Sequence, residues 1–518
     1  MKMDKKKRSS GYSFFIALVV SLGGFLFGFD ASVISGVIGF VSPQFNLNVI
    51  QQGWVVSSPS FAAMFAMLLS GTISDIIGRK KVLIYAAVLY AVSAVLSALA
   101  PNYQWLVTAR MIGGIAFGAV LILAPLYIGE IAPSEKRGRL VSIQQLNIVL
   151  GFSASYFSNY FLLGLMDAAA SPLDEFNVWR WMLGVESLPA ILYLILLFFV
   201  PKSPRWLLNR GKEQEAQQVL NTIFGEERAQ KEKEKIKQKL RDQNEKTSLS
   251  TLFKPGMKIV MLLGITIGVV QQITGVNAIF FYATTIFEQS GVGKNAAFSQ
   301  AIFVGIINVV FTLLAMAFID RLGRRPLMLT GLAGVILSMA ITSYGFYKAT
   351  YTLTEENVQG ISQALDRTKL RPFYHITYDN DVDFKNALKE ALGENVFGKY
   401  ESEIIQAAAK INPVVILIGI LAFVASFAFS LGPVMWVLFS EIFPGRNRGL
   451  AIAFFGFINS CTSTFVQFIF PWELANLGNA GAYLIFGLFG VIGLLLLAKF
   501  LPETKGKSLE DIETLLVK

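Results

Sequence analysis

Twelve stretches of mostly apolar residues, each about as long as a membrane-spanning helix, run through this sequence. An α-helix needs about 20 such residues to cross the hydrocarbon core of a bilayer. Soluble domains contain about 25% charged residues, whereas this chain contains 15%. The sequence therefore predicts an all-α membrane protein with twelve transmembrane helices. We expect them near residues 14–41, 54–74, 82–100, 105–129, 140–163 and 180–200, and then near 258–287, 297–319, 326–347, 412–440, 449–471 and 480–501.

Basic residues are concentrated in short clusters between these apolar stretches. The clusters lie at 5–8, 79–81, 136–139, 321–325 and 446–448, whereas the alternate connections at 42–52, 101–104 and 473–480 contain no Lys or Arg. This alternation follows the rule that cytosolic loops carry an excess of Lys and Arg. It predicts a multi-pass protein of the cell (inner or plasma) membrane with both termini in the cytosol. The net charge of +10 then reflects contact with a lipid bilayer, and no nucleic-acid partner is expected.

Two short motifs recur in the second half of the chain. Asp75-x-x-Gly78-Arg79 returns as Asp320-x-x-Gly323-Arg324, and Glu130-x-x-Pro133 with Arg137 returns as Glu441-x-x-Pro444 with Arg448. Each copy follows the corresponding helix of its half, as expected for a transporter built from repeated six-helix units. We therefore expect two six-helix bundles with an internal repeat, at 1–201 and 258–518, joined by a charged, helical and cytosolic linker at 202–257.

The second pair of motif copies is spaced further apart than the first, which indicates an insertion between Asp320 and Glu441. The polar segment 348–410 fits this insertion and is expected on the extracytoplasmic side. Within it, Phe384, Ala387, Leu388, Ala391 and Leu392 have the spacing of an amphipathic helix. We interpret the segment as a surface cap over the outer mouth, with a partner-binding or regulatory module as the alternative.

Side chains suited to metal or redox chemistry are scarce. Cys461 is the only cysteine and His375 the only histidine, so neither an intrachain disulfide nor a histidine-based metal site can form. No nucleophile–base pair and no phosphate-binding loop is recognisable. The sequence predicts no cofactor, no metal and no enzymatic activity.

Five further motifs carry a resemblance to a known family. They are Arg110-Met-Ile-Gly-Gly, Pro201-Lys-Ser-Pro-Arg205-Trp206-Leu, Gln271-Gln272-Ile-Thr-Gly275-Val-Asn277, Gly432-Pro433-Val-Met-Trp436 and Pro502-Glu-Thr-Lys-Gly506. In this order they resemble the sugar porter family of the major facilitator superfamily, over nearly the whole chain except the insertion. The nearest relatives are expected to be bacterial proton-coupled sugar symporters and animal glucose facilitators.

A sugar site needs amides more than charges, because each hydroxyl both donates and accepts, and an aromatic face for the ring. Amides are costly in hydrocarbon unless they face a cavity or a partner. The resemblance implies that the sugar is bound by a set of amides and one Trp, namely Gln145, Gln271, Gln272, Asn277, Asn308, Trp436 and Asn459. Hydrogen bonding between helices is the alternative reading of these amides. At three positions, Phe152, Phe281 and Ser460, the chain departs from the bacterial symporter pattern of Gln, Tyr and Trp.

Asp30 is an isolated charge in the otherwise apolar first helix. Arg110 in the fourth helix and Glu186 in the sixth are expected at a similar depth in the membrane. An acid at the position of Asp30 resembles the proton-coupled symporters, and protonation could switch when an Asp30–Arg110 pair forms or breaks. A static pair that only supports packing is the alternative.

The repeated motifs are expected to form an inner gate, in which Arg side chains pair with carboxylates of neighbouring helices. The predicted gate residues are Asp75, Arg79, Glu130, Arg137, Asp320, Arg324, Glu441 and Arg448. Anchors that merely set topology are the alternative, although that rule requires no acidic partners. Ile76 stands where relatives often have a basic residue, which would weaken the contact in the first half.

These observations together predict secondary active transport of a monosaccharide, a hexose or pentose, by sugar:proton symport with alternating access. The expected partners are a small-molecule sugar, a proton and the bilayer, and the protein is expected to be a monomer. A sugar uniporter and a sugar sensor that does not transport remain alternatives.

Overall fold

A computed structural model describes residues 2–133, 136–166, 171–242, 253, 257–362, 364–443 and 448–507. Within these residues, twelve helical segments are long and apolar enough to cross a membrane, which confirms the predicted number of spans. Each of the twelve overlaps the apolar stretch from which it was predicted. Large apolar side chains such as Phe161, Leu188 and Leu495 are exposed on the outside of the helices. Such an apolar exterior suits contact with lipid rather than water.

The first six spans are formed by α1 (Lys2–Gln44), α2 (Val49–Ile77), α3 (Arg79–Ala98), α4 (Tyr103–Ile131), α5 (Arg137–Met166) and the consecutive α6 (Val178–Gly184) and α7 (Ser187–Phe198). The next six are formed by α11 (Lys258–Ile273) with α12 (Val276–Phe281) and α13 (Ala283–Gln289), by α14 (Lys294–Leu322), α15 (Arg324–Tyr347), α18 (Pro413–Phe429) with α19 (Leu431–Glu441), α20 (Arg448–Asn476) and α21 (Gly478–Phe500). We refer to these two sets as the first and second half.

Close packing inside the first half depends on small residues. A Cβ atom on Gly28 of α1 would lie 2.0 Å from the carbonyl oxygen of Ile148 on α5. A Cβ atom on Gly114 of α4 would lie 2.2 Å from the carbonyl oxygen of Pro59 on α2. Small residues at helix crossings let backbones approach in this way within a membrane. These two crossings bring α1, α2, α4 and α5 together around the depth of Asp30.

Three short helices lie between the halves: α8 (Pro204–Asn209), α9 (Glu213–Phe224) and α10 (Glu226–Asp242). Glu213 of α9 forms ion pairs with Lys233 and Lys237 of α10, and these ion pairs connect the two helices. Most of the remaining predicted linker, 243–252 and 254–256, lies outside the described residues.

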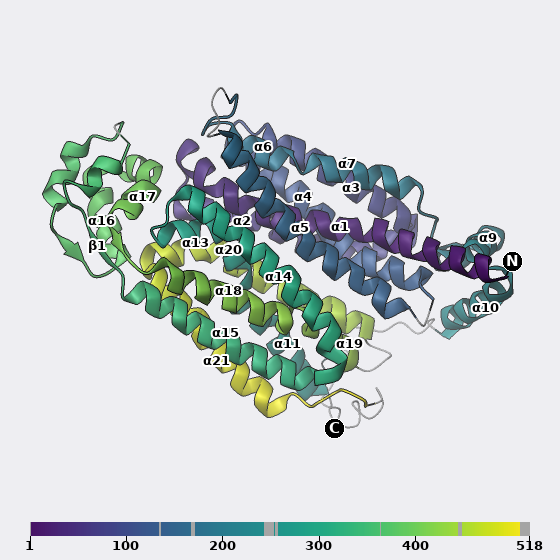
Figure 1. Ribbon diagram of the computed structural model, residues 1–518. Coiled ribbons are helices and arrows are strands. Elements are labelled where there is room, and N and C mark those ends of the chain that lie inside the picture. Colours follow the sequence, from purple (N-terminus) through teal and green to yellow (C-terminus); the bar gives the residue numbers. More distant parts are fainter. Residues whose placement is uncertain are drawn as a thin grey trace.

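The insertion, which we call the cap (348–410), folds around a small core of its own. It contains β1 (Thr350–Thr352), η3 (Asn357–Gly360), η4 (Arg367–Phe373), β2 (Thr377–Tyr378), α16 (Asp381–Leu392), α17 (Glu394–Ala408) and β3 (Ala409–Lys410). The strands form an antiparallel sheet in the order β2-β1-β3, which closes the insertion where it leaves α15 and enters α18. Phe384 and Leu388 of the predicted amphipathic helix are buried in the cap core, as their spacing predicts. The cap lies beyond one end of the helical bundle (Figure 1).

The two halves meet at the end of the bundle that carries the cap, and we call this the cap end. Here the backbone N–H of Thr284 donates to the Oγ of Ser35 at 3.0 Å, and the rings of Phe40 and Phe298 lie 6.5 Å apart. Figure 1 shows the halves spreading apart toward the opposite end, near α9 and α10, which we call the linker end. Along α2, a Cβ atom on Gly53 would touch α20, whereas one on Gly71 would meet nothing within 4 Å. The two halves are therefore in contact at the cap end and spread apart toward the linker end (Figure 1).

Candidate transport site

Four of the predicted amides form one hydrogen-bonded cluster in the second half. Asn459 of α20 donates through Nδ2 to Gln271 Oε1 at 2.7 Å, and Gln272 donates through Nε2 to Asn459 Oδ1 at 3.1 Å. Asn277 donates to Gln272 Oε1 at 2.8 Å and to Ser463 Oγ at 2.5 Å. Because these amides face one another within the membrane, their polar groups are satisfied without water.

A break in the seventh span positions this cluster. Gly275 has φ of +91°, and α11 ends and α12 begins around it. Only glycine adopts this backbone conformation without strain, and a Cβ atom here would lie 2.4 Å from the Phe486 ring. The break lets Asn277 turn back toward Gln272, five residues earlier in the chain.

The cluster also reaches the first half through residues that the sequence analysis missed. Gln467 donates to Ser463 Oγ at 2.8 Å, and Ser60 of α2 donates to Gln467 Oε1 at 2.9 Å. Asn459, Ser463 and Gln467 are spaced four residues apart and so lie on one face of α20. That spacing is visible in the sequence and would have identified Ser463 and Gln467.

The other three predicted sugar-binding residues lie outside this hydrogen-bonded cluster. Asn308 is buried and Gln145 half-buried, and among the described residues neither side chain makes a hydrogen bond. Trp436 follows the helix break at Ser430 and is 43% exposed. Its ring lies 3.8 Å from the Cβ position of Gly456, which is three residues before Asn459 on α20. The indole of Trp436 therefore lies near the α20 side of the cluster, whereas no contact connects Gln145 or Asn308 to the cluster among the described residues.

Aromatic side chains from both halves meet at the cap-end side of these amides. Phe152 lies on the same face of α5 as Gln145, two turns nearer the cap end. Its ring centroid lies 4.9 Å from that of Phe280 and 6.5 Å from that of Phe281, both on α12. The hydroxyl of Tyr156 donates to the Phe280 carbonyl at 2.5 Å. The apolar residues Phe152 and Phe281 therefore take part in the contact between the halves on the cap-end side of the amides.

The predicted Asp30–Arg110 pair is present and buried. Arg110 Nη1 lies 3.4 Å from Asp30 Oδ1, and the side chains are 1% and 5% exposed. Arg110 also donates through Nε to the Val55 carbonyl at 2.9 Å. In a regular helix this carbonyl would accept from residue 59, but Pro59 has no N–H. The Val55 carbonyl, which Pro59 leaves without a backbone donor, is thus the second anchor for Arg110.

The second oxygen of Asp30, Oδ2, has no hydrogen-bond partner among the described residues although it is buried. Glu186 is also buried and lies close enough to Asp30 and Arg110 to interact with both electrostatically. The three predicted charged residues are therefore brought together, with two carboxylates and one guanidinium. Such an arrangement is costly to bury unless the charges are balanced.

The repeated motifs form one polar cluster in each half at the linker end. In the first half, Arg79 pairs with Asp75 and, through Nε, with Glu130 Oε1 at 3.2 Å. Ser203, from the Pro201 motif, donates to the same Glu130 carboxylate. These contacts join α2, α3, α4 and the start of α8.

The second half repeats this arrangement. Arg324 Nη2 lies 3.0 Å from Glu441 Oε1, and Thr504 donates to Glu441 Oε2 at 2.6 Å. Glu503 accepts from the backbone N–H groups of Arg324 and Arg325, both at 3.1 Å. Burial raises the pKa of Glu503, but the N–H donors of Lys505, Arg324 and Arg325 outweigh burial and lower this pKa below its ordinary value.

Three predicted gate residues are not placed in these clusters. Arg137 is exposed and forms no ion pair with any described residue. The side chains of Asp320 and Arg448 lie outside the described part of the chain. Among the described residues of these two clusters, each ion pair joins two groups of the same half.

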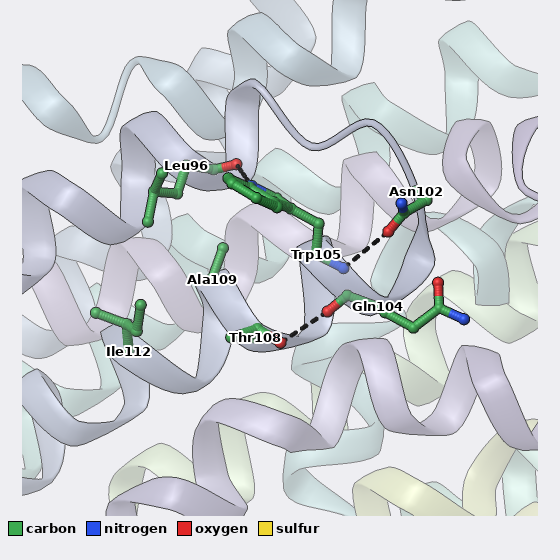
Figure 2. A pocket seen from close by; sticks show the side chains of 7 residues that line it. All are labelled: Leu96, Asn102, Gln104, Trp105, Thr108, Ala109 and Ile112. Atoms are coloured by element: carbon green, nitrogen blue, oxygen red, sulfur yellow. Dashed lines mark hydrogen bonds between the residues drawn. The ribbon is translucent and has the colours of Figure 1, made fainter.

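A shallow pocket of about 410 Å³ lies at the cap end of α3 and α4 (Figure 2). The indole of Trp105 forms part of its wall and donates to the Leu96 carbonyl at 3.0 Å, while Asn102 caps the start of α4 (Figure 2). None of the predicted sugar-binding, proton-coupling or gate residues lines this pocket. It is a surface feature of the first half.

Comparisons with known proteins agree with this architecture. The family model described as "Sugar (and other) transporter" matches residues 16–364 and 392–516, which leaves 365–391 in the cap unmatched. The chain is 34% identical to the arabinose-proton symporter of Bacillus subtilis, over 99% of this chain and 97% of that protein. It is 35% identical to the D-xylose-proton symporter of Escherichia coli K12, over 98% of this chain and 96% of that protein.

Among solved structures, the chain is similar to the inward open conformation of the E. coli xylose transporter XylE. The TM-score is 0.73 with 32% sequence identity, and the match covers 98% of this chain and 100% of that chain. The partially occluded inward open conformation of the same transporter gives a TM-score of 0.72, with 96% and 100% coverage. The protein therefore belongs to the sugar porter family of the major facilitator superfamily and has its fold of two six-helix halves.

Proposed function

We propose that this protein is a sugar:proton symporter that carries a monosaccharide, a hexose or pentose, by alternating access. The observation that carries the proposal is the buried Asp30–Arg110 pair in the first half. A carboxylate buried in this way is costly, and its usual purpose within a membrane is transport or coupling. The names of the arabinose-proton and D-xylose-proton symporters, which cover nearly the whole chain, support the same function.

The sugar is proposed to bind between the halves at the amide cluster. Gln271, Gln272, Asn277 and Asn459 already hydrogen-bond one another, so an arriving sugar exchanges these bonds for bonds to its hydroxyls. The proposed site also includes Gln145 and Asn308, whose amides have no side-chain partner to displace, and Trp436 as the face for the sugar ring. Since a hydroxyl both donates and accepts, amides can pair with it in either sense.

Asp30 is proposed to take up the transported proton. Its Oδ2 has no hydrogen-bond partner among the described residues and is therefore free to receive a proton. When Asp30 is neutral, its attraction for Arg110 weakens, while the Val55 carbonyl continues to hold the guanidinium. Glu186, which is buried and close enough to interact electrostatically with Arg110, is the second acid of the proposed proton-coupling site.

The proton gradient supplies enough free energy for accumulation. Moving one proton down 100 mV releases about 2.3 kcal/mol. One pH unit adds about 1.4 kcal/mol. A total of about 3.7 kcal/mol supports a sugar gradient of about 500-fold.

We base alternating access on the difference between the two ends of the bundle, because the halves are in contact at the cap end and spread apart at the linker end (Figure 1). The cap end is held closed by contacts between the halves such as Thr284–Ser35 and Tyr156–Phe280. We assign the linker end to the cytosol, with both termini there and the cap outside, because the basic clusters lie at the linker end. In this orientation the structure is inward-open, and the Arg79–Glu130 and Arg324–Glu441 clusters are the two sides of the proposed inner gate.

The proposed organisation is a first bundle at 1–201, a cytosolic linker at 202–257 and a second bundle at 258–518 with the cap at 348–410. The Arg79–Glu130 and Arg324–Glu441 pairs each lie within one bundle, which agrees with bundles that move as separate bodies. We propose that one chain suffices for transport, because each proposed sugar, proton and gate residue comes from the same chain.

Uptake by purified protein in proteoliposomes tests this function. With an inward proton gradient, the vesicles should concentrate one or more labelled monosaccharides, and dissipation of the gradient should abolish accumulation. Equilibration without accumulation would identify a uniporter. Binding without any movement of sugar would identify a sensor.

A further inference from the structure

The cap is connected to the helices of the second half by a chain of polar contacts. Asn479, at the start of α21, donates through Nδ2 to Asp381 Oδ2 on α16 at 2.7 Å, and its backbone N–H donates to the same oxygen at 3.2 Å. Lys385, one turn further along α16, lies 3.4 Å from Asp381 Oδ2. Both Asp381 and Lys385 are buried, so this connection is shielded from water.

The chain of contacts continues to the seventh span. Lys385 Nζ lies 3.6 Å from Glu401 Oε1 on α17, and Gln289 at the end of α13 donates to the same oxygen at 3.0 Å. We call the contacts from Asn479 through Asp381, Lys385 and Glu401 to Gln289 the cap relay.

The cap relay ends on α13, a helix of the second half that contacts the first half at the cap end. Thr284 at the start of α13 contacts Ser35 of α1 in the other half, so α13 must leave α1 if the cap end is to open. Helix α17 contacts α1 as well. Because the cap relay joins α13 to α17, opening requires either that the relay breaks or that α17 leaves α1 together with α13. Both routes lose contacts that the six-helix halves alone do not provide.

Two members of the cap relay lie in the segment that the family model does not match. Residues 365–391 are unmatched, and they include Asp381 and Lys385. Asp381 and Lys385 therefore belong to a part of the cap that the family model does not describe, whereas Gln289 and Glu401 lie in the matched residues.

We propose that the cap relay restrains α13 and stabilises the state in which the cap end is closed. This inference rests on the proposed alternating access. Asp381, Lys385 and Glu401 are positioning residues that act through α13 and do not touch the sugar. Loss of the relay shifts the protein toward the state that is open at the cap end.

A distance measurement that needs neither sugar nor proton gradient tests the proposal. Spin labels are attached to Gly39→Cys on α1 and Ala296→Cys on α14 in full-length protein carrying Cys461→Ser. Gly39 and Ala296 are exposed and lie beside the contacting rings of Phe40 and Phe298. Double electron–electron resonance then reports the populations with the cap end closed and open.

Lys385→Met and Glu401→Gln should each raise the ratio of open to closed population about fivefold or more, the lower end of coupling between sites. The matched controls are Lys369→Met and Glu390→Gln, which alter exposed cap residues outside the relay and should leave the ratio unchanged. Gln289→Ala cuts the relay from α13 without altering the cap, and should shift the ratio in the same direction even if a cap variant misfolds.

Unchanged distances in Gln289→Ala and in folded Lys385→Met protein would refute the restraint. Equal shifts in the control variants would also refute it, since they would indicate general loosening of the cap. A failure of sugar accumulation in the uptake assay would instead count against the proposed function, and would leave these distances unaffected.

Discussion

Arg110 donates a hydrogen bond of 2.9 Å to the carbonyl of Val55, a group that Pro59 leaves without its usual backbone donor. A proline within a helix ordinarily weakens the structure because one hydrogen bond is lost. Here the Val55 carbonyl, which has no backbone donor, accepts from Arg110 instead. It thereby holds the guanidinium beside Asp30, where Arg110 Nη1 lies 3.4 Å from Asp30 Oδ1. Arg110 can thus stay in place when Asp30 changes its charge.

This relationship predicts an effect of Pro59→Ala, which restores the N–H at residue 59. The Val55 carbonyl then has a backbone donor, and Arg110 loses an anchor whose hydrogen bond to a charged group contributes about 1.5–3 kcal/mol. Proton-driven accumulation should fall relative to exchange of labelled for unlabelled sugar, while sugar affinity stays near the wild-type value. Pro125→Ala, at another proline within a helix, is the control and should keep the wild-type ratio.

The amide cluster predicts that Gln272→Ala or Asn277→Ala weakens sugar binding by about 1 kcal/mol or more, because a buried hydroxyl loses its partner. Calorimetry on purified protein measures the affinity. Gln359→Ala, at an exposed position in the cap, should bind sugar as the wild type does. Wild-type affinity in a folded Gln272→Ala variant would remove that residue from the site.

The break at Gly275 predicts a large cost for Gly275→Ala. The residue has φ of +91°, and the new Cβ atom would lie 2.4 Å from the Phe486 ring, so backbone strain and a steric clash add together. We expect a loss of about 1–3 kcal/mol, visible as a lower Tm. Gly129→Ala is the matched control because nothing lies within 4 Å of its Cβ position. A Tm for Gly275→Ala as high as that of the control would contradict the described break.

Glu503 predicts a stability difference that depends on pH. Its pKa is lowered in the folded protein, because the backbone N–H donors of Lys505, Arg324 and Arg325 outweigh the effect of burial, which alone would raise it. A lowered folded pKa contributes stability above the unfolded value of about 4.3, and this contribution disappears as pH falls through the folded pKa. Glu503→Gln should therefore have a lower Tm than wild type at pH 7, and the difference should shrink below about pH 4.

The control for this experiment is Glu390→Gln, at an exposed position on α16. Its Tm should follow the wild type at both pH values. A difference between Glu503→Gln and wild type that is equally large at both pH values would exclude the charge of Glu503 as its cause.

The twelve spans could be predicted from the sequence because the length of an apolar run is imposed by the thickness of the bilayer. The resemblance also groups Gln271, Gln272, Asn277 and Asn459 in one predicted site, and the structure brings these four side chains together. The second anchor of Arg110 was not anticipated. It depends on how closely α4 approaches Pro59, and that distance is not encoded in any local pattern.

In the cap, too, one element could be predicted from local sequence spacing and the others could not. Its amphipathic helix was predicted from the spacing that begins at Phe384, whereas the sheet was missed because strands of two or three residues are too short to display alternation. Ion pairs between elements distant in sequence, such as Lys385–Glu401, follow from tertiary packing. Arg137, expected in the inner gate, is exposed in this conformation, so its role in the gate stays a prediction.

The central claim is that Asp30 carries the proton, and Asp30→Asn in proteoliposomes tests it most directly. Asn keeps the shape of the side chain but cannot take up and release a proton. Glu186→Gln, the neighbouring acid, is measured in parallel as a comparison. Each preparation is assayed for accumulation driven by a proton gradient and for exchange of labelled for unlabelled sugar.

The account predicts that Asp30→Asn abolishes accumulation, bringing the ratio of internal to external sugar to about 1, while binding and exchange persist. An Asp30→Asn protein that concentrates sugar as well as the wild type would contradict the account.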